Sequence, residues 1–308
     1  MKPNHLIIFL LFFPLIASAQ QRDSVIKVDQ NYVTLSEVVV NRSLDVAAFI
    51  KKIKEDTTFY KAFKNLHIIG YKAINDIRLL DKKGNIESSL KSTTRQIVKN
   101  NCREMEVIDQ KTTGNFFDKN GNYNSYTASL YASWFFTNGT VCGENNIVKG
   151  TDFNASGLHG MEKHKAQLKM LFFNPGKKIT GLPFISGKTA IFDDGMAENY
   201  DMKIDYEEGV NGPAYLFSID VKPGRKDRVV IDHMTIWFDA NTFEILARKY
   251  ALSYDAGVYD FDVSMNIKMA RIKNLLVPVL ITYNGNWKAI FKKRERAIFT
   301  ATLSELKL

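Results

Sequence analysis

The sequence predicts an α+β protein in which a large curved antiparallel sheet, a half-barrel, packs on a few helices. From Tyr200 onward, apolar and polar residues alternate along a series of segments, which is typical of half-buried strands. Before Tyr200, three segments repeat apolar residues at helical spacing. A sheet with one apolar face needs such helices to cover it, so the two patterns together predict this architecture.

The clearest alternation lies at residues 259–270. Its apolar set is Phe261, Val263, Met265, Ile267 and Met269, and its polar set is Asp260, Asp262, Ser264, Asn266 and Lys268. Tyr215, Phe217, Ile219 and Val221 repeat the pattern. We predict that each apolar set faces the core and each polar set faces water.

Turn-like residues separate these and the other predicted strands, at 229–238, 245–254, 276–283, 287–293 and 297–303. The separators are 222–225, 239–242, 255–257 and Asn284-Gly285-Asn286, and the last contains the Asn-Gly pair that tight hairpins favour. The second half of the chain is therefore predicted to be a long antiparallel meander.

Helices and two further strands are expected before it. Val46, Phe49, Ile50 and Ile53 share a helical face, with Ser43 available as N-cap and Asp45 in the first turn. Strands are predicted at 66–80 and 86–98, joined by a turn at 81–85. Helices are predicted at 126–135, after Ser125, and at 161–173, before the stop Asn174-Pro175-Gly176.

The amino end has the pattern of a cleavable signal peptide. Lys2 precedes an apolar run at 6–16 and then Ala17-Ser18-Ala19, which fits the A-x-A cleavage rule. No later apolar run reaches the roughly 18 residues of a membrane span, so no transmembrane helix is expected in the mature chain. We predict a signal peptide at 1–19, an extended N-terminal segment at 20–43 and a single sheet domain with its covering helices at 44–308.

The chain is basic, with a formal charge of +9 that falls by one when the signal peptide and Lys2 are removed. Basic residues favour anionic partners, but here they are scattered among 33 acidic ones, which argues against nucleic-acid binding. The run at 292–296 beside Trp287 and Phe291 suits an anionic membrane surface or, alternatively, a charged strand end that protects an edge.

Cys102 and Cys142 are the only cysteines. In an oxidising compartment they can form a disulfide, and otherwise each can be a buried thiol. Both alternatives remain open at this stage.

Residues with catalytic chemistry do not form a known pattern. His159 and His164 are five apart and do not share a helical face, unlike the zinc-binding histidines of metalloproteases. Acidic pairs at 193–194, 207–208 and Asp260/Asp262 have the patterns of turns or of the wet face of a strand. We therefore predict a protein that is not an enzyme and needs neither cofactor nor metal.

Two short segments resemble known families. Residues 234–239, with Glu244-Ile245 beyond the turn, resemble the strand-Asp-turn-strand hairpin of the LolA/LolB family of lipoprotein carriers. That family implies a curved sheet around helices, with an apolar cavity for acyl chains. Residues 35–40, Leu-Ser-Glu-Val-Val-Val, resemble a segment of TonB-dependent receptors and related exported proteins of the Bacteroidetes, and the whole chain resembles uncharacterised exported proteins of that phylum.

These resemblances imply an exported protein, periplasmic or outer-membrane associated, that binds a hydrophobic or lipidated ligand inside a LolA-like half-barrel. The expected ligand-binding residues are Tyr215, Phe217, Phe261, Val263, Met265, Ile267 and Met269. One alternative is a structural module that adds residues 32–40 as a strand to an outer-membrane protein partner. A hydrolase of an envelope polymer is another.

Overall fold

The computed structural model describes residues 23–29, 31–42, 44–148, 160–179, 185–193, 195–209, 212–255, 259–289 and 293–308. The predicted signal peptide at 1–19 lies outside these residues.

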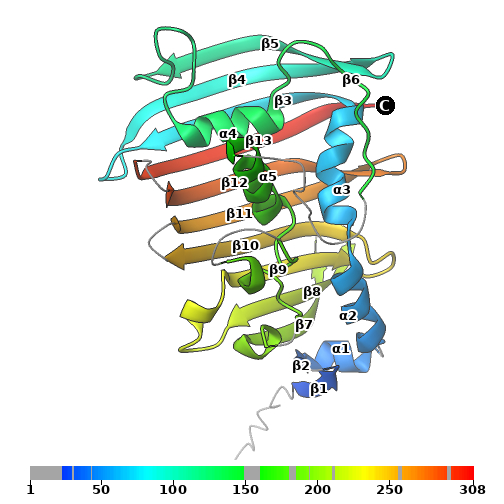
Figure 1. Cartoon of the computed structure of the whole chain (residues 1–308). Coiled ribbons are helices and arrows are strands. Elements are labelled where there is room, and N and C mark those ends of the chain that lie inside the picture. Colours follow the sequence, from blue (N-terminus) through cyan, green and yellow to red (C-terminus); the bar gives the residue numbers. More distant parts are fainter. Residues whose placement is uncertain are drawn as a thin grey trace, which may run out of the picture.

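The described strands form one open sheet in the order β1-β2-β7-β8-β9-β10-β11-β12-β13-β3-β4-β5-β6 (Figure 1). All neighbours are antiparallel except β2 and β7. The strands are β1 (Ser24–Val28), β2 (Asn31–Leu35), β3 (Gly70–Leu80), β4 (Ile86–Lys99), β5 (Cys102–Thr113), β6 (Val141–Cys142), β7 (Tyr200–Gly209), β8 (Gly212–Val221), β9 (Ile231–Asp239), β10 (Ile245–Asp255), β11 (Tyr259–Ile272), β12 (Leu275–Ala289) and β13 (Glu295–Lys307). The predicted large antiparallel sheet is confirmed, and it is not closed into a barrel.

The predicted alternation in β11 is confirmed. Val263 is 1% exposed and pairs with Leu252 of β10 and Gly285 of β12. The next residue, Ser264, is exposed and lies on the opposite face. Because side chains alternate along a strand, this register buries all five apolar residues of the set.

The predicted hairpin at Asn284-Gly285-Asn286 is wrong, since β12 runs straight through it. A Cβ atom at Gly285 would collide with the ring of Tyr283, which lies over it. The glycine therefore makes room for an aromatic side chain within a strand, a role that the Asn-Gly pattern does not reveal.

The described α-helices are α1 (Glu37–Asn41), α2 (Val46–Glu55), α3 (Thr58–Asn65), α4 (Tyr126–Phe135) and α5 (Gly160–Phe173). Figure 1 shows them on one face of the sheet, with α4 and α5 in front of its centre and α1 to α3 along one side. The predicted helices α2, α4 and α5 are confirmed. The N-cap of α2 is Asp45, whose Oδ1 accepts from Ala48 N at 3.0 Å, in place of the expected Ser43, which lies outside the described residues.

The single extended segment predicted at 32–40 is wrong in its second half. The chain pairs with β7 through β2, and Ser36 N donates to Ile204 O at 3.1 Å. It then turns into α1, where Val39 N and Val40 N donate to Ser36 O. The helical turn buries Val39 and leaves Val40 exposed. A continued strand would also place these two residues on opposite faces, so the sequence pattern does not distinguish a strand from a helix here.

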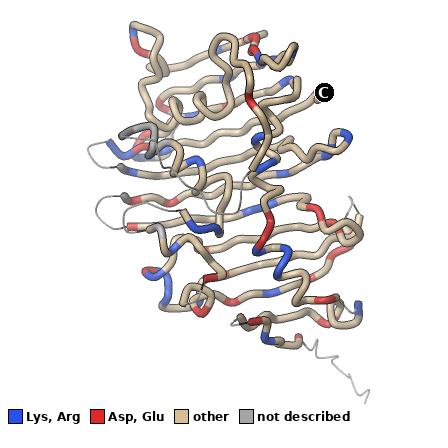
Figure 2. Tube along the Cα trace, turned by 45° about the vertical axis from the view of Figure 1, so that its right-hand side comes forward, with Lys and Arg blue, Asp and Glu red and all other residues tan. Residues whose placement is uncertain are grey.

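Charged residues of both signs are interspersed along the strands and loops (Figure 2). Several form ion pairs across the outer face of the sheet, as between Arg78 and Asp76 at 2.6 Å and between Lys72 and Glu305 at 3.4 Å.

Candidate functional site: the interior between helices and sheet

All seven predicted ligand-binding residues lie on the helix-covered face of the sheet and are buried, with exposed fractions of 9% or less. Tyr215 and Phe217 come from β8 and the other five from β11. Phe49 of α2 packs on Tyr215 with ring centroids 5.8 Å apart. These residues form the packed floor of the interior. Phe261 borders a surface pocket that it shares with Lys188, Asp227 and Tyr254.

An apolar cavity of about 20 Å³ lies instead between α4, α5 and the strands β12 and β13. Its lining residues are Thr127, Leu130, Tyr131, Trp134, Leu168, Phe172, Tyr283, Trp287 and Phe299. A space of this size holds about one water molecule. The sequence predicted the helices that cover it, but not that the cavity lies under them.

Aromatic rings pack closely around this cavity. Tyr283 stacks on Phe299 with centroids 4.6 Å apart, and Trp134 lies edge-on to Phe172 at 5.7 Å and to Phe173 at 5.2 Å. Phe173 also packs on Phe63 of α3, at 4.2 Å. Through these contacts, α5 is attached to its surroundings by aromatic side chains.

The amino end of α4 is held by Glu295 at the start of β13. The Glu295 carboxylate accepts from Tyr126 N and Thr127 N, both at 2.8 Å, and from the hydroxyls of Ser125 and Thr127 at 2.8 and 2.6 Å. Trp287 Nε1 donates to the same Thr127 hydroxyl at 2.7 Å. A carboxylate at a helix amino terminus is stabilised by the free N–H groups and the helix dipole, so α4 is fixed to the sheet at this end.

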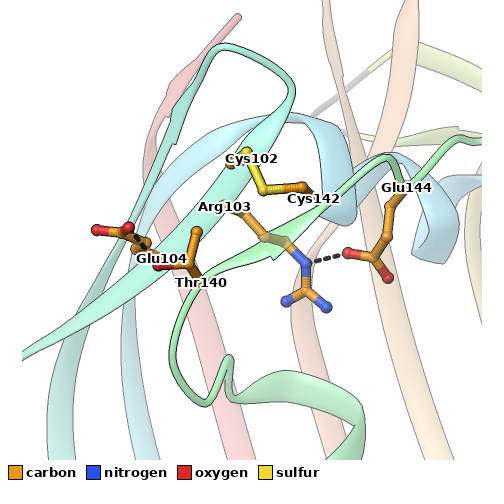
Figure 3. Close-up of a disulfide and its surroundings, with 6 residues drawn as sticks. All are labelled: Cys102, Arg103, Glu104, Thr140, Cys142 and Glu144. Atoms are coloured by element: carbon orange, nitrogen blue, oxygen red, sulfur yellow. Dashed lines mark hydrogen bonds and ion pairs between the residues drawn. A yellow bond between two sulfur atoms is a disulfide. The ribbon is translucent and has the colours of Figure 1, made fainter.

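A disulfide between Cys102 and Cys142 fixes the chain that follows α4 (Figure 3). It joins β5 to the short strand β6, and Thr140 Oγ1 donates to Glu104 Oε1 at 2.6 Å beside it. Of the two alternatives left open by the sequence, the structure contains the bridge. The segment that carries α4 is therefore anchored at both ends.

A partly buried polar cluster lies next to the disulfide. His67 Nδ1 lies 2.9 Å from Glu144 Oε1, and Arg103 donates to the other carboxylate oxygen and to Thr137 (Figure 3 shows Arg103 and Glu144). Burial, reinforced by the positive charge of Lys169, lowers the pKa of His67 to about 4. Both oxygens of the carboxylate are engaged, so the cluster holds the chain after β6 against the start of β3.

This cluster predicts a pH-dependent stability. In the folded protein His67 stays neutral down to about pH 4, whereas in the unfolded chain it takes up a proton below about 6.5. Unfolding therefore binds a proton in this window, and the free energy of unfolding falls as the pH falls from 6.5 to 4. We expect the melting temperature of His67→Gln to depend less on pH across this window than that of the wild type. Parallel curves for the two proteins would contradict the assignment.

The interior also contains a charged residue, Arg248 of β10, which is 3% exposed. Its guanidinium lies 4.0 Å over the ring of Phe59, and its nearest carboxylate, Asp56, is 3.8 Å away. Asp56 already accepts from Thr58 N at 3.0 Å, from the Thr58 hydroxyl and from Phe59 N. Burial lowers the pKa of Arg248, and its Nε atom has no hydrogen-bond partner.

His233 lies in a line of hydrogen-bonded side chains on the outer face. Its Nδ1 is 2.6 Å from Asp220 Oδ1 and its Nε2 is 3.0 Å from Thr235 Oγ1. This order of side chains resembles a hydrolase triad. However, Thr235 lies in β9, which pairs with β8 on one side and β10 on the other, so the backbone N–H groups around it form the hydrogen bonds of the sheet. With no free N–H groups there to stabilise an oxyanion, the line is a cross-strand contact of the kind expected for an ordinary strand residue.

The acidic pairs singled out in the sequence have structural partners. Glu207 accepts from Trp237 Nε1 at 3.0 Å, Glu208 pairs with Arg42 at 3.2 Å, and Asp260 pairs with Arg294. Asp262 is exposed on the outer face. Asp194 and His159 lie outside the described residues.

Neither a metal-binding cluster nor a membrane-spanning helix is present among the residues that the structure describes. No group of three or more His, Cys, Asp or Glu side chains is arranged to hold a metal ion there. Within the same residues, no helix is long and apolar enough to cross a bilayer.

No protein family matches the sequence, and no curated protein matches it significantly. Among solved structures, a DUF1329 family protein from Desulfovibrio piger is similar at 10% identity and a TM-score of 0.24, over 82% of this chain and 93% of that one. An outer membrane lipoprotein-sorting protein domain from Vibrio parahaemolyticus is similar at 6% identity and a TM-score of 0.27, over 79% and 88%. Lipovitellin is similar at 9% identity and a TM-score of 0.25, and this chain spans 25% of its length. TM-scores this low do not assign a function to the chain.

Proposed function

We propose that this protein is a non-enzymatic, envelope-associated protein that binds a hydrophobic or lipidated ligand between its helices and its sheet. The observation that carries the proposal is the aromatic cavity between α4, α5 and the strands β12 and β13. Protein interiors are usually close-packed, so a gap lined by rings at the contact between two layers is a natural point of entry for an apolar chain.

The cavity must widen to hold a ligand, and the two helices differ in how firmly they are held. Glu295 and the Cys102–Cys142 disulfide fix the two ends of the α4 segment. Near the cavity, α5 contacts its surroundings through the rings of Phe172 and Phe173, and the Phe172 carbonyl accepts a hydrogen bond from Tyr250. We therefore assign the movement to α5.

The tryptophans give a direct test. Of the three in the chain, Trp134 and Trp287 line the cavity, whereas Trp237 lies on the outer face and donates to Glu207. In a Trp237→Phe protein, all tryptophan fluorescence reports on the cavity. We expect brominated fatty acyl chains to quench it, and native mass spectrometry of the purified protein to detect bound lipid.

A matched pair of variants localises the effect. Leu168→Phe adds bulk to the cavity wall and should weaken quenching by about tenfold, since overpacking costs roughly 1–3 kcal/mol and each 1.4 kcal/mol is about tenfold in affinity. Leu216→Phe adds the same bulk on the outer face of β8 and should leave quenching unchanged. Failure of every acyl chain to quench either tryptophan would overturn the proposed function.

A further inference from the structure

Arg248 is the interior group that packing does not explain. Its neighbours on the inner face of the sheet are Ile236 of β9 and Ile267 of β11, and Phe59 covers it. A guanidinium carries five N–H donors, yet the buried Nε atom of Arg248 has no hydrogen-bond partner and its Nη2 atom lies 3.8 Å from Asp56. Burying unpaired donors of a charged group is costly, so the site is suited to an additional acceptor.

Asp56 does not fill this need. Its carboxylate lies 3.8 Å from the guanidinium, beyond hydrogen-bond distance. Its oxygens accept from Thr58 and Phe59 and so serve the beginning of α3. Asp56 offsets part of the charge of Arg248 while leaving its donors free.

A row of side chains connects Arg248 to the aromatic cavity. Tyr250 lies two residues along β10 on the same face, donates its hydroxyl to the Phe172 carbonyl, and contacts Met265 Sδ at 3.2 Å. Phe172 itself lines the cavity. The path from the cavity to Arg248 thus runs beneath the carboxyl end of α5.

We propose that Arg248 binds the acidic group of an amphiphilic ligand, a carboxylate or a phosphate, whose acyl chain extends toward the aromatic cavity. This inference rests on the proposed function and adds the ligand class to it. A carboxylate or phosphate presents two oxygens to a guanidinium, which matches the neighbouring Nε and Nη2 donors of Arg248: Nε has no partner and Nη2 is 3.8 Å from Asp56. The acyl chain takes the space into which Phe172 now projects, so binding requires α5 to move.

The test compares ligands that share a chain and differ in the head group. Quenching of Trp134 and Trp287 is titrated with brominated stearic acid, brominated stearyl alcohol and brominated stearyl phosphate, in the Trp237→Phe protein. We expect at least one of the two acids to bind about tenfold or more tighter than the alcohol, the effect of a charge-assisted hydrogen bond. The acid that binds tighter identifies the head group.

Variants show whether Arg248 is responsible. Arg248→Met should remove the preference for the acid while retaining alcohol binding, and Arg248→Lys should keep part of it. Lys249→Met, one residue away on the exposed face, should behave as wild type. The ratio of acid to alcohol binding in the Trp237→Phe protein needs no change at Arg248, so it tests the preference even if Arg248→Met folds poorly.

The outcomes separate the two proposals. Equal binding of the alcohol and both acids would overturn the role of Arg248 and leave the proposed function intact. A preference for the acid that persists in a folded Arg248→Met protein would also overturn it. Absence of quenching by all three ligands would overturn the proposed function itself.

Discussion

Val263→Asp should prevent stable folding, whereas Ser264→Asp should be nearly neutral. Val263 is 1% exposed between Leu252 and Gly285, so an aspartate there places an unpaired carboxylate in an apolar core. The cost is about 4 kcal/mol or more, a large part of the roughly 5–15 kcal/mol by which domains are stable. The matched change at Ser264 falls on the wet face and should cost about 0.5 kcal/mol or less.

Thermal unfolding of the two variants measures the difference. A melting temperature of Ser264→Asp near that of the wild type, with Val263→Asp unfolded or strongly destabilised, supports the register of β11. Equal losses in the two proteins would mean that the strand does not present these faces as described.

Removing the Glu295 carboxylate should produce the second largest loss. Glu295→Ala deletes four hydrogen bonds at the amino end of α4 and leaves Tyr126 N and Thr127 N without their acceptor. We expect a loss of about 2–3 kcal/mol, typical of charged hydrogen bonds at a helix terminus. Because Trp287 shares the Thr127 hydroxyl, its fluorescence should shift to longer wavelength.

Glu106→Ala is the control for this variant. Glu106 is an exposed carboxylate whose nearest cation, on Arg95, is 3.9 Å away, and such surface pairs contribute little to stability. We expect at most about 0.5 kcal/mol of change. If Glu295→Ala unfolds at the same temperature as Glu106→Ala, then Glu295 does not anchor α4.

The alternation of apolar and polar residues predicted the sheet because a strand buried on one face requires an apolar residue at every second position. It failed where that constraint is absent. β5 has only the two-residue strand β6 beyond it and is largely exposed on both faces, so its sequence shows no alternation and does not predict a strand. At Gly285, pairing with Val263 of β11 and Ala297 of β13 overrides the local turn preference, and the ring of Tyr283 occupies the space beside the glycine.

The site was harder to predict than the sheet, although signals were present. Arg248 falls at an inward position of the predicted strand at 245–254, in phase with the buried Tyr250 and Leu252, and a charged residue there is unusual. Glu295 appeared only as one member of a basic run. Its partners are about 170 residues away, so no local pattern could show that it holds a helix.

The position of β13 has a consequence for how the molecule reaches this structure. Residues 295–307 form a strand in the middle of the sheet, between β12 and β3, although they come after every other strand in the chain. During synthesis, β3 to β6 and β7 to β12 can form separately, but they cannot join until β13 emerges. Strand pairing over such sequence distances is slow, so the sheet cannot be completed until residues 295–307 have left the ribosome.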